Sequence, residues 1–483
     1  MEYINKRNPI LPLKYHVPDG EAHVMPDGKL YVYGSYDALD ETFCSQEYYA
    51  VSTEDMEHWT VHDDAAFLAQ DVPWMGDPQA KHYPGLDWTH PTPFLQKMID
   101  AMPEEVKAAA IEAQKAEAEA AEARKGDGTE GEIQTAAAQT EDGCGQDRKQ
   151  ELLFAPDCIH RNGKYYLYFC MSDDSEGVAV SDRPEGPFKD PVQLPCGGID
   201  PAIFIDDDGQ AYYYWGQVFA HGVKLNDDMV SFDENGIVND IVTEEEHCFH
   251  EGSSMRKIGD TYYYVYADIE RGKPTSLGYA TGKSPLGPFT YRGIIIDNDG
   301  CDPQSWNNHG SIECVDGQWY VFYHRCSRGT QQHRRLCIEK ITVNPDGTID
   351  EVKMTSQGIG EPFAPGEKIM GYQACGLKGN CCIDVDNDYG YEEKLARISD
   401  GDEAVFRYVK NKAAWKRIEI TCAGSGVVSV FLNGERAGEV HVSGESGKMQ
   451  TVSVPVTMDA GEYELMLRFE KPERLEVMSV TLF

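Results

Sequence analysis

A glycine-containing turn that leads into a tyrosine-rich segment occurs five times along this chain. Counted from the turn glycine, the five segments are residues 28–33, 163–169, 209–215, 259–266 and 317–323. Turns that recur in this way, each ahead of residues that favour strands, are typical of hairpins in radially repeated β-sheets. We therefore predict an all-β fold with a five-bladed β-propeller, in which each hairpin starts one blade.

One conspicuous polar residue lies a short distance before each turn. These residues are Asp19, Asp157, Asp200, Glu251 and His309. If each belongs to the innermost strand of its blade, the five side chains line the central axis of the propeller. We therefore expect carboxylates and a histidine to converge on one pocket, although they lie far apart in the sequence.

The gap between the first and second hairpins is much longer than the others, and the excess falls in residues 94–150. This segment is rich in alanine and glutamate, which are strong helix formers, and Pro103 suits the first turn of a helix. We predict a helical insertion on the outside of the propeller. A solvated excursion or a partner-binding arm is favoured over a lid that covers the pocket.

The pattern changes after a linker-like segment rich in glycine and proline, residues 360–366. Beyond it, short segments alternate apolar and polar residues, and Asn433-Gly434 is a typical hairpin turn. We predict two domains: the propeller over residues 1–365 and a β-sandwich of jelly-roll size over residues 366–483.

The chain is strongly acidic, with a formal net charge of −39 at pH 7. Such a charge argues against nucleic acid and anionic membranes as partners and favours a neutral small ligand. Residues 1–7 lack the apolar segment of a secretory signal, and the 14 cysteines show no zinc-site spacing. We therefore expect a cytoplasmic protein with reduced thiols; its oligomeric state cannot be predicted.

Two carboxyl groups that face one pocket are what glycosidic bond cleavage requires. One gives a proton to the leaving oxygen, and the other, ionised, activates a water molecule. A third carboxylate nearby raises the pKa of the acid by like-charge repulsion. Asp157, in an apolar segment, must be desolvated or paired, and Glu251 is followed by Gly252, which permits close approach of a ligand.

Five short sequences, taken together and in order, resemble glycoside hydrolase family 43, whose members are five-bladed propellers that invert the anomeric centre. They are residues 18–24, 155–157, 198–209, 250–252 and 308–312, and the resemblance spans about residues 7–355 without the insertion. It implies that Asp19 is the general base, Glu251 the general acid, and Asp157 the residue that modulates the pKa of the acid.

The same resemblance implies residues that bind ligands. His309 is similar to an axial histidine that in many members holds a water or a calcium ion, so it implies a structural calcium in some members but no cofactor required for catalysis. Arg334 or Arg335 is similar to the late active-site arginine of the family. Trp74 and Trp215 are candidate sugar platforms, with ordinary packing as the alternative.

Some assignments stay open at this point. Family members usually have Asp-Pro at the base, whereas here Gly20 follows Asp19, and Glu21 is therefore a rival base. For Asp200 a structural role is the simpler explanation, because an Asp-Pro pair suits the start of a strand. For His23 the simpler explanation is a place in the core.

The C-terminal domain resembles family 6 carbohydrate-binding modules over about residues 401–480, although a late asparagine typical of their sugar site is missing. The two resemblances imply an exo-acting inverting glycosidase that releases terminal arabinofuranose or xylose from an oligosaccharide substrate. A β-galactofuranosidase and a non-catalytic sugar-binding propeller are the alternatives.

Overall fold

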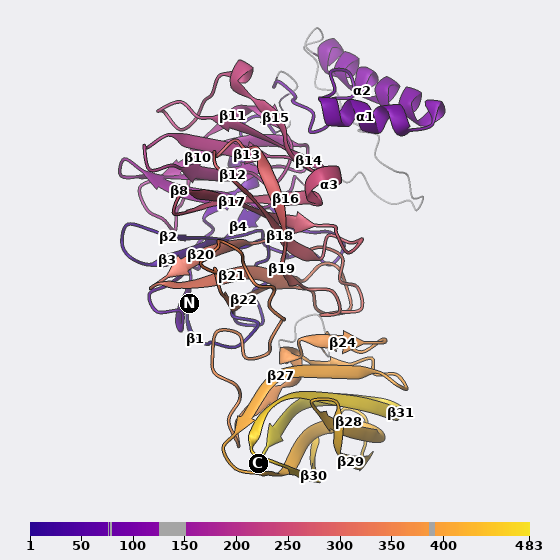
Figure 1. Ribbon diagram of the computed structural model, residues 1–483. Helices are drawn as coiled ribbons and strands as arrows, with labels where there is room; N and C mark the ends of the chain where they lie inside the picture. The colour runs from indigo at the N-terminus through magenta and orange to yellow at the C-terminus, as the bar shows by residue number, and fades with distance from the viewer. Residues whose placement is uncertain (76, 78–79, 125–150, 386–391) are drawn as a thin grey trace.

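The computed structural model of the protein describes residues 1–75, 77, 80–124, 151–385 and 392–483. Five antiparallel sheets follow one another along the chain and form a five-bladed propeller, and a β-sandwich-like domain follows it (Figure 1). The predicted all-β fold class is confirmed, and the described part of the insertion is helical.

The strands of each blade run outward from the axis in chain order, except that β1 (Glu2–Ile4) is the outermost strand of blade 1. Blade 1 also contains β2 (Glu21–Val24), β3 (Leu30–Tyr33), β5 (Ala50–Thr53) and β6 (His58–Val61). Blade 2 contains β8 (Asp157–Arg161), β9 (Lys164–Cys170), β10 (Ser175–Ser181) and β11 (Lys189–Gly197). Blade 3 contains β12 (Ala202–Ile205), β13 (Ala211–Trp215), β14 (Phe219–Lys224) and β15 (Val238–Thr243).

Blade 4 contains β16 (Phe249–Ile258), β17 (Thr261–Asp268), β18 (Ser276–Gly282) and β19 (Phe289–Asp297). Blade 5 has three strands, β20 (Ser311–Val315), β21 (Gln318–Arg325) and β22 (Arg335–Ile341). The connecting segments contain a small pair, β4 (Glu47–Tyr48) with β7 (Phe67–Leu68), and the short helices η1 (Ala69–Asp71), η2 (Glu234–Gly236) and α3 (Glu244–His247).

The innermost strands β2, β8, β12, β16 and β20 form a closed ring. Each contacts its two neighbours in the ring, and β20 contacts β2. A parallel bridge between Gly20 and Gly310 joins the first and last blades just before these two strands begin. Residues at the starts of the inner strands therefore gather at one end of the axis.

The repeated tyrosines of the hairpins hold neighbouring blades together. Tyr33 of blade 1 donates a hydrogen bond from its hydroxyl to the carbonyl of Pro184 in blade 2, at 2.7 Å. Tyr214 of blade 3 donates in the same way to Pro285 of blade 4, at 2.8 Å. A buried tyrosine needs such an acceptor, so these contacts explain why a tyrosine run and a proline-containing turn repeat together.

The insertion begins with α1 (Pro93–Ala101), which Thr92 caps by accepting a hydrogen bond from the backbone N–H of Leu95. Leu95 and Ile99 are buried against Phe219 of blade 3. Helix α2 (Glu104–Arg124) follows, and both helices lie outside the blades (Figure 1). Over the described residues the insertion adds no blade strand; the predicted range 94–150 extends into 125–150, which lies outside the described residues.

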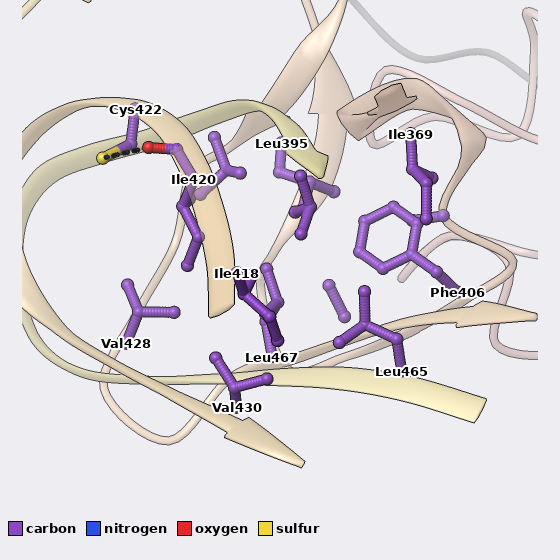
Figure 2. Close-up of a cluster of buried hydrophobic side chains, with 14 of the residues drawn as sticks. Ile369, Leu395, Phe406, Ile418, Ile420, Cys422, Val428, Val430, Leu465 and Leu467 are labelled. Carbon is purple, nitrogen blue, oxygen red and sulfur yellow. Dashed lines mark hydrogen bonds between the residues drawn. The ribbon is translucent and has the colours of Figure 1, made fainter. Parts of the chain in front are cut away.

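The C-terminal domain is one strongly curved sheet folded over its own core. Its elements are β23 (Lys368–Met370), η3 (Gly371–Gln373), β24 (Gly376–Lys378), β25 (Cys382–Asp384), β26 (Lys394–Ala396), β27 (Glu403–Asn411), β28 (Trp415–Leu432), β29 (Glu435–Ser443), β30 (Gln450–Met458) and β31 (Gly461–Leu482). Apolar side chains from β27, β28 and β31 point toward one another between its layers (Figure 2). The resemblance of this domain to family 6 carbohydrate-binding modules stays a prediction.

Two chain-wide observations complete the fold. Every cysteine that the structure describes is free, and most are buried. None of the described helices combines the length and apolar character needed to cross a membrane.

Candidate active site

Asp19, Asp200 and His309 occupy equivalent positions, each two residues before the inner strand of its blade. Asp19 and Asp200 both have a left-handed backbone, with φ of 57° and 55°, which aspartate adopts more readily than most residues. The Nδ1 atom of His309 lies 4.0 Å from Asp19 Oδ1 and 3.6 Å from Asp200 Oδ2. The three buried side chains therefore meet at one end of the axis.

Asp19 is held as a carboxylate by cationic and hydrogen-bonding partners. Arg334 Nη1 donates to Asp19 Oδ1 at 2.9 Å, and His324 Nδ1 lies 3.2 Å from the same oxygen. Burial alone raises the pKa of Asp19, but Arg334 and His324 outweigh it and hold the pKa well below its usual range. Asp19 is therefore ionised over the neutral pH range.

Arg334 is itself fixed by Asp37. Its Nε and Nη2 atoms donate to the two carboxylate oxygens of Asp37, both at 2.9 Å. A bidentate pair of this kind sets the orientation of the guanidinium plane. Arg334 is thus the arginine of the site, and Asp37 is a positioning residue that sequence reasoning missed.

Asp200 is buried next to two other acids. Burial, together with the charges of Glu251 and Asp19, raises its pKa well above the ordinary value. Asp200 therefore keeps its proton to higher pH than an isolated carboxyl would.

Glu251 lies near the start of β16, and Gln217 donates to its Oε2 atom at 2.8 Å. Asn307 Nδ2 approaches the other oxygen, Oε1, at 3.5 Å. The next residue, Gly252, has φ of 76°, and a Cβ atom there would lie 2.9 Å from the ring of His309. Glycine at this position therefore allows the acid and the axial histidine to lie close together.

The structure does not place Asp157 with these residues. Asp157 is the first residue of β8, and its Oδ1 lies 2.7 Å from His23 Nε2. His23 Nε2 is also 3.6 Å from Glu21 Oε1, and Arg256 Nη2 lies 2.8 Å from that Glu21 oxygen. The expectation that Asp157 meets Asp19 and Glu251 is therefore corrected: Asp200 is the third acid beside them.

This second group, Glu21, His23, Asp157 and Arg256, has its own electrostatics. Burial raises the pKa values of Glu21 and Asp157 to about 7, and it lowers that of His23 to about 4. The rival base Glu21 is bound to Arg256, and no contact between Glu21 and Asp200 or Glu251 occurs within the described ranges. Asp19, and not Glu21, is the acid that shares a site with Glu251.

The donor atoms of Glu21, His23 and Asp157 lie within 4.8 Å of one another, close enough to surround a metal ion. Calcium takes six to eight oxygen ligands. Here Arg256 already binds Glu21, and the backbone N–H of Ile203 donates to Asp157 Oδ2 at 2.8 Å. The group is therefore acidic, but it fits calcium poorly. The guanidinium of Arg256 and the backbone amide of Ile203 already bind its carboxylate oxygens.

The other predicted ligand-binding residues lie elsewhere. Arg335 lies at the junction of the two domains, where its Nη2 binds Glu393 of the C-terminal domain and the carbonyl of Leu13 near the start of the chain. Trp215 is 3% exposed and stacks on Tyr213 at 5.4 Å between ring centroids. Trp74 is 9% exposed and stacks on a phenylalanine of blade 2. The packing of both indole rings inside the blades argues against sugar platforms.

A different tryptophan lies beside the site in sequence. Trp306 is 48% exposed and is the only exposed tryptophan in the described part of the chain. It precedes Asn307, which contacts Glu251 through its side chain and accepts a hydrogen bond from His324 at its carbonyl, at 3.0 Å. No sequence pattern predicted that Trp306 is exposed, because its exposure depends on how its loop folds.

Comparison with known proteins agrees with this arrangement. The family model described as Glycosyl hydrolases family 43 matches residues 132–349. A Xylosidase/arabinosidase of Thermoclostridium stercorarium is 27% identical over 507 residues, covering 90% of each chain. Xylosidase/arabinosidase 43A of Humicola insolens is 35% identical over 251 residues, covering 41% of this chain and 74% of that one.

A solved structure shares the fold. The crystal structure of the GH43_1 enzyme from Xanthomonas citri complexed with xylose superposes with a TM-score of 0.50 at 24% identity, covering 72% of this chain and 94% of that one. The family model matches this chain, and the chain covers 74% of the Humicola protein at 35% identity. The chain therefore belongs to glycoside hydrolase family 43.

Proposed function

We propose that the protein is an exo-acting glycosidase that releases terminal arabinofuranose or xylose from oligosaccharides with inversion. The observation that carries this proposal is the meeting of Asp19, Asp200 and Glu251 around His309. Arg334 keeps Asp19 ionised, whereas burial and the charges of Glu251 and Asp19 raise the pKa of Asp200. That division of protonation states is what acid- and base-assisted hydrolysis requires.

In this mechanism Asp19 is the general base. Its carboxylate accepts a proton from a water molecule, which attacks the anomeric carbon on the face opposite the leaving group. Glu251 is the general acid and protonates the leaving oxygen as the glycosidic bond breaks. Inversion needs the two carboxyls roughly 6.5–9.5 Å apart, so that the water fits between them.

Asp200 takes the role that sequence reasoning gave to Asp157. The charge of Glu251 disfavours ionisation of Asp200, and Asp200 in turn lies beside the residue that protonates the leaving group. Asp157 is proposed instead to be a structural acid of the channel.

The sugar specificity rests on the relatives. Xylosidase and arabinosidase activities appear in the names of the Thermoclostridium and Humicola proteins. A second candidate is β-galactofuranoside hydrolysis, because a Beta-D-galactofuranosidase of Aspergillus niger is 33% identical over 214 residues. Buried His309, His324 and Arg334 close the axial side of the site, which supports removal of terminal sugars over cleavage within a chain.

The test is a screen of the purified protein with aryl α-L-arabinofuranoside, β-D-xyloside and β-D-galactofuranoside. Proton NMR of the first product formed should show the anomer opposite to that of the substrate. Retention of configuration, or no hydrolysis of any of the three, would contradict the proposal.

The mechanism requires no cofactor, because carboxyls and water supply every proton transfer. A calcium ion in the channel, with His309 as a ligand through water, remains part of the proposal as a structural element only. Dialysis against EDTA should leave the hydrolysis rate unchanged, and metal analysis of the protein before dialysis reports whether calcium is bound.

A cytoplasmic location is also proposed, supported by the free state of the cysteines that the structure describes. Imported oligosaccharides are the substrates that such a location supplies. Cell fractionation with an antibody against the native protein tests it.

A further inference from the structure

The loop between β13 and β14, residues 216–218, brings a polar side chain to the proposed acid. Gln217 Nε2 donates a hydrogen bond to Glu251 Oε2 at 2.8 Å. Because Oε2 already accepts this bond, the proton of the carboxyl group belongs on the other oxygen, Oε1. Gln217 therefore fixes which oxygen of Glu251 carries the proton that the leaving group receives.

The backbone of this loop is strained at Val218, the residue after Gln217. Its φ angle is 69°, in the left-handed region. A β-branched side chain rarely adopts that conformation, because its Cβ substituents crowd the neighbouring peptide groups. Such a conformation persists only where surrounding contacts impose it. The contacts of Val218 therefore show what holds the loop in place.

Two backbone hydrogen bonds join Val218 to the segment that carries the acid. Its N–H donates to the carbonyl of His250, the residue before Glu251, at 2.6 Å. Its carbonyl accepts from the N–H of Glu244, the first residue of α3, at 3.0 Å. A displacement of Val218 would therefore disturb both Gln217 and the backbone beside the acid.

The apolar contacts of Val218 come from helix α1 of the insertion. Leu95 and Ile99 of α1 are buried and form a small apolar cluster with Phe219, distinct from the cores of the blades. Val218 packs against this cluster. Phe94 packs there too, with its ring edge-to-face on that of Phe219 at 5.9 Å between centroids. Helix α1 is therefore the apolar support of the strained residue.

Polar contacts fix the place of α1 itself. The backbone N–H of Phe94 donates to Asp240 Oδ2 of β15 at 3.0 Å. Lys97 Nζ lies 2.6 Å from Glu245 Oε1 of α3. The ion pair is exposed and contributes little stability, but together with the first bond it sets the helix against two elements that flank the loop. The apolar cluster then supplies the main attachment.

We propose that helix α1 positions the general acid: it holds Val218 in its strained conformation and thereby keeps Gln217 hydrogen-bonded to Glu251. This inference rests on the proposed role of Glu251 as the acid. Val218 and the apolar residues of α1 are positioning residues, because they act on Glu251 through Gln217. The first helix of the insertion thus serves catalysis, a role that differs from the solvated excursion favoured by the sequence.

The kinetic test is Leu95→Ala in the full chain. It should lower kcat by about tenfold or more on xylobiose and much less on an aryl glycoside with a good leaving group, because only the former needs a well-placed acid. Leu95→Met, of similar volume, should keep the wild-type rates. Leu194→Ala removes an equally buried leucine from the core around blades 2 and 3 and is the matched control. Equal losses on both substrates for Leu95→Ala, or the same leaving-group dependence in Leu194→Ala, would overturn the proposal.

A double variant tests whether the helix acts through Gln217. Leu95→Ala combined with Gln217→Ala should be no slower on xylobiose than Gln217→Ala alone, because residues that act through one contact are not additive. Losses that multiply would show that Leu95 acts by another route and would overturn the proposal.

Hydrogen exchange tests the support of Val218 without any assumption about catalysis. In Ile99→Val, which removes a single methylene and keeps the fold, the Val218 amide should exchange several-fold faster than in the wild type. Unchanged exchange would overturn the proposal. The kinetics of Glu251→Gln separate the two levels of the argument. Without leaving-group dependence in Glu251→Gln, the proposed function itself fails; with it in Glu251→Gln but not in Leu95→Ala, the positioning role of α1 alone fails.

Discussion

Arg334 and Asp19 form a buried ion pair, with Nη1 of the arginine 2.9 Å from Oδ1 of the aspartate. The pair joins blade 5 to the start of blade 1, and it keeps the proposed base ionised where burial alone would protonate it. The state of Asp19 is thus set by a residue more than 300 positions away in the sequence.

Arg334→Met should move the acidic limb of the pH–kcat/KM profile to higher pH. The arginine lowers the pKa of Asp19, and activity requires Asp19 without its proton, so loss of the arginine makes the base protonate at higher pH. Arg334→Lys keeps a positive charge and should shift the limb less. An acidic limb that stays in place in both variants would contradict the proposed effect of Arg334.

Asp200→Asn should move the basic limb to lower pH, whereas Asp157→Asn should leave that limb in place. The basic limb marks loss of the proton that the acids of the site hold, and the raised pKa of Asp200 keeps a proton there to higher pH than asparagine can. The pH dependence of kcat/KM on an oligosaccharide measures both. The reverse outcome would restore Asp157 to the role that the sequence suggested.

Glu251→Gln should lower kcat by about 10²–10⁴ on xylobiose and far less on an aryl glycoside with a good leaving group. An activated leaving group departs without protonation, so the acid matters little to it. Asp19→Asn should be equally severe on both substrates, because water must be activated in either case. Equal loss on both substrates for Glu251→Gln would speak against its role as the acid.

Asp157→Asn should gain stability relative to the wild type as the pH rises from about 4 to about 7. Burial raises the pKa of Asp157 to about 7 in the folded protein, so folding favours the protonated form. This contribution is complete below the unfolded pKa and is lost as the pH rises through the folded one. Asparagine cannot titrate, so the variant lacks this pH dependence.

The measurement for Asp157 is urea unfolding of both proteins at several pH values, and Asp19→Asn provides the control. The pKa of Asp19 is lowered on folding, so its contribution to stability is present above the unfolded pKa and is lost only as the pH falls below it. The difference between Asp19→Asn and the wild type should therefore stay flat between pH 4 and 7. A flat difference for Asp157→Asn as well would mean that its carboxyl is ionised in the folded protein.

Trp306→Ala should raise KM for oligosaccharides several-fold and leave the hydrolysis of a glycosyl fluoride unchanged. Trp306 adjoins Asn307, which contacts the proposed acid, and the acid faces the leaving group; we therefore expect this indole to stack on the leaving-group sugar. A fluoride has no such sugar. Val238→Ala, another exposed apolar residue, is the control, and equal losses on both substrates would assign Trp306 a structural effect instead.

The sequence predicted the propeller because turn glycines and tyrosines repeat locally, and each hairpin requires its own turn chemistry. It also predicted Asp19, Glu251 and His309 as members of one site. Asp157 was misplaced, and the reason is visible in the spacing. Asp19 and Asp200 each lie nine residues before their turn glycine, whereas Asp157 lies six residues before Gly163.

On an inner strand, a residue that is fewer positions before the turn lies farther along the axis from the end where the strands begin. Asp157 therefore reaches the group of Glu21 and His23 and not the group of Asp19. The roles of Asp37 and His324 could not be predicted, because both act through contacts with residues that lie far away in the sequence. The sequence could not distinguish Arg334 from Arg335 either. The side chains of these adjacent residues point in different directions, one toward Asp19 and the other toward Glu393.

The closed ring of inner strands bears on how the enzyme is made in the cell. Asp19 emerges from the ribosome early, but its arginine and axial histidine belong to the last blade. A nascent chain that stops before residue 334 would carry both proposed acid and base yet leave Asp19 without the partner that keeps it charged. Hydrolytic activity is therefore expected only after synthesis has passed residue 334 and the fifth blade has closed the ring.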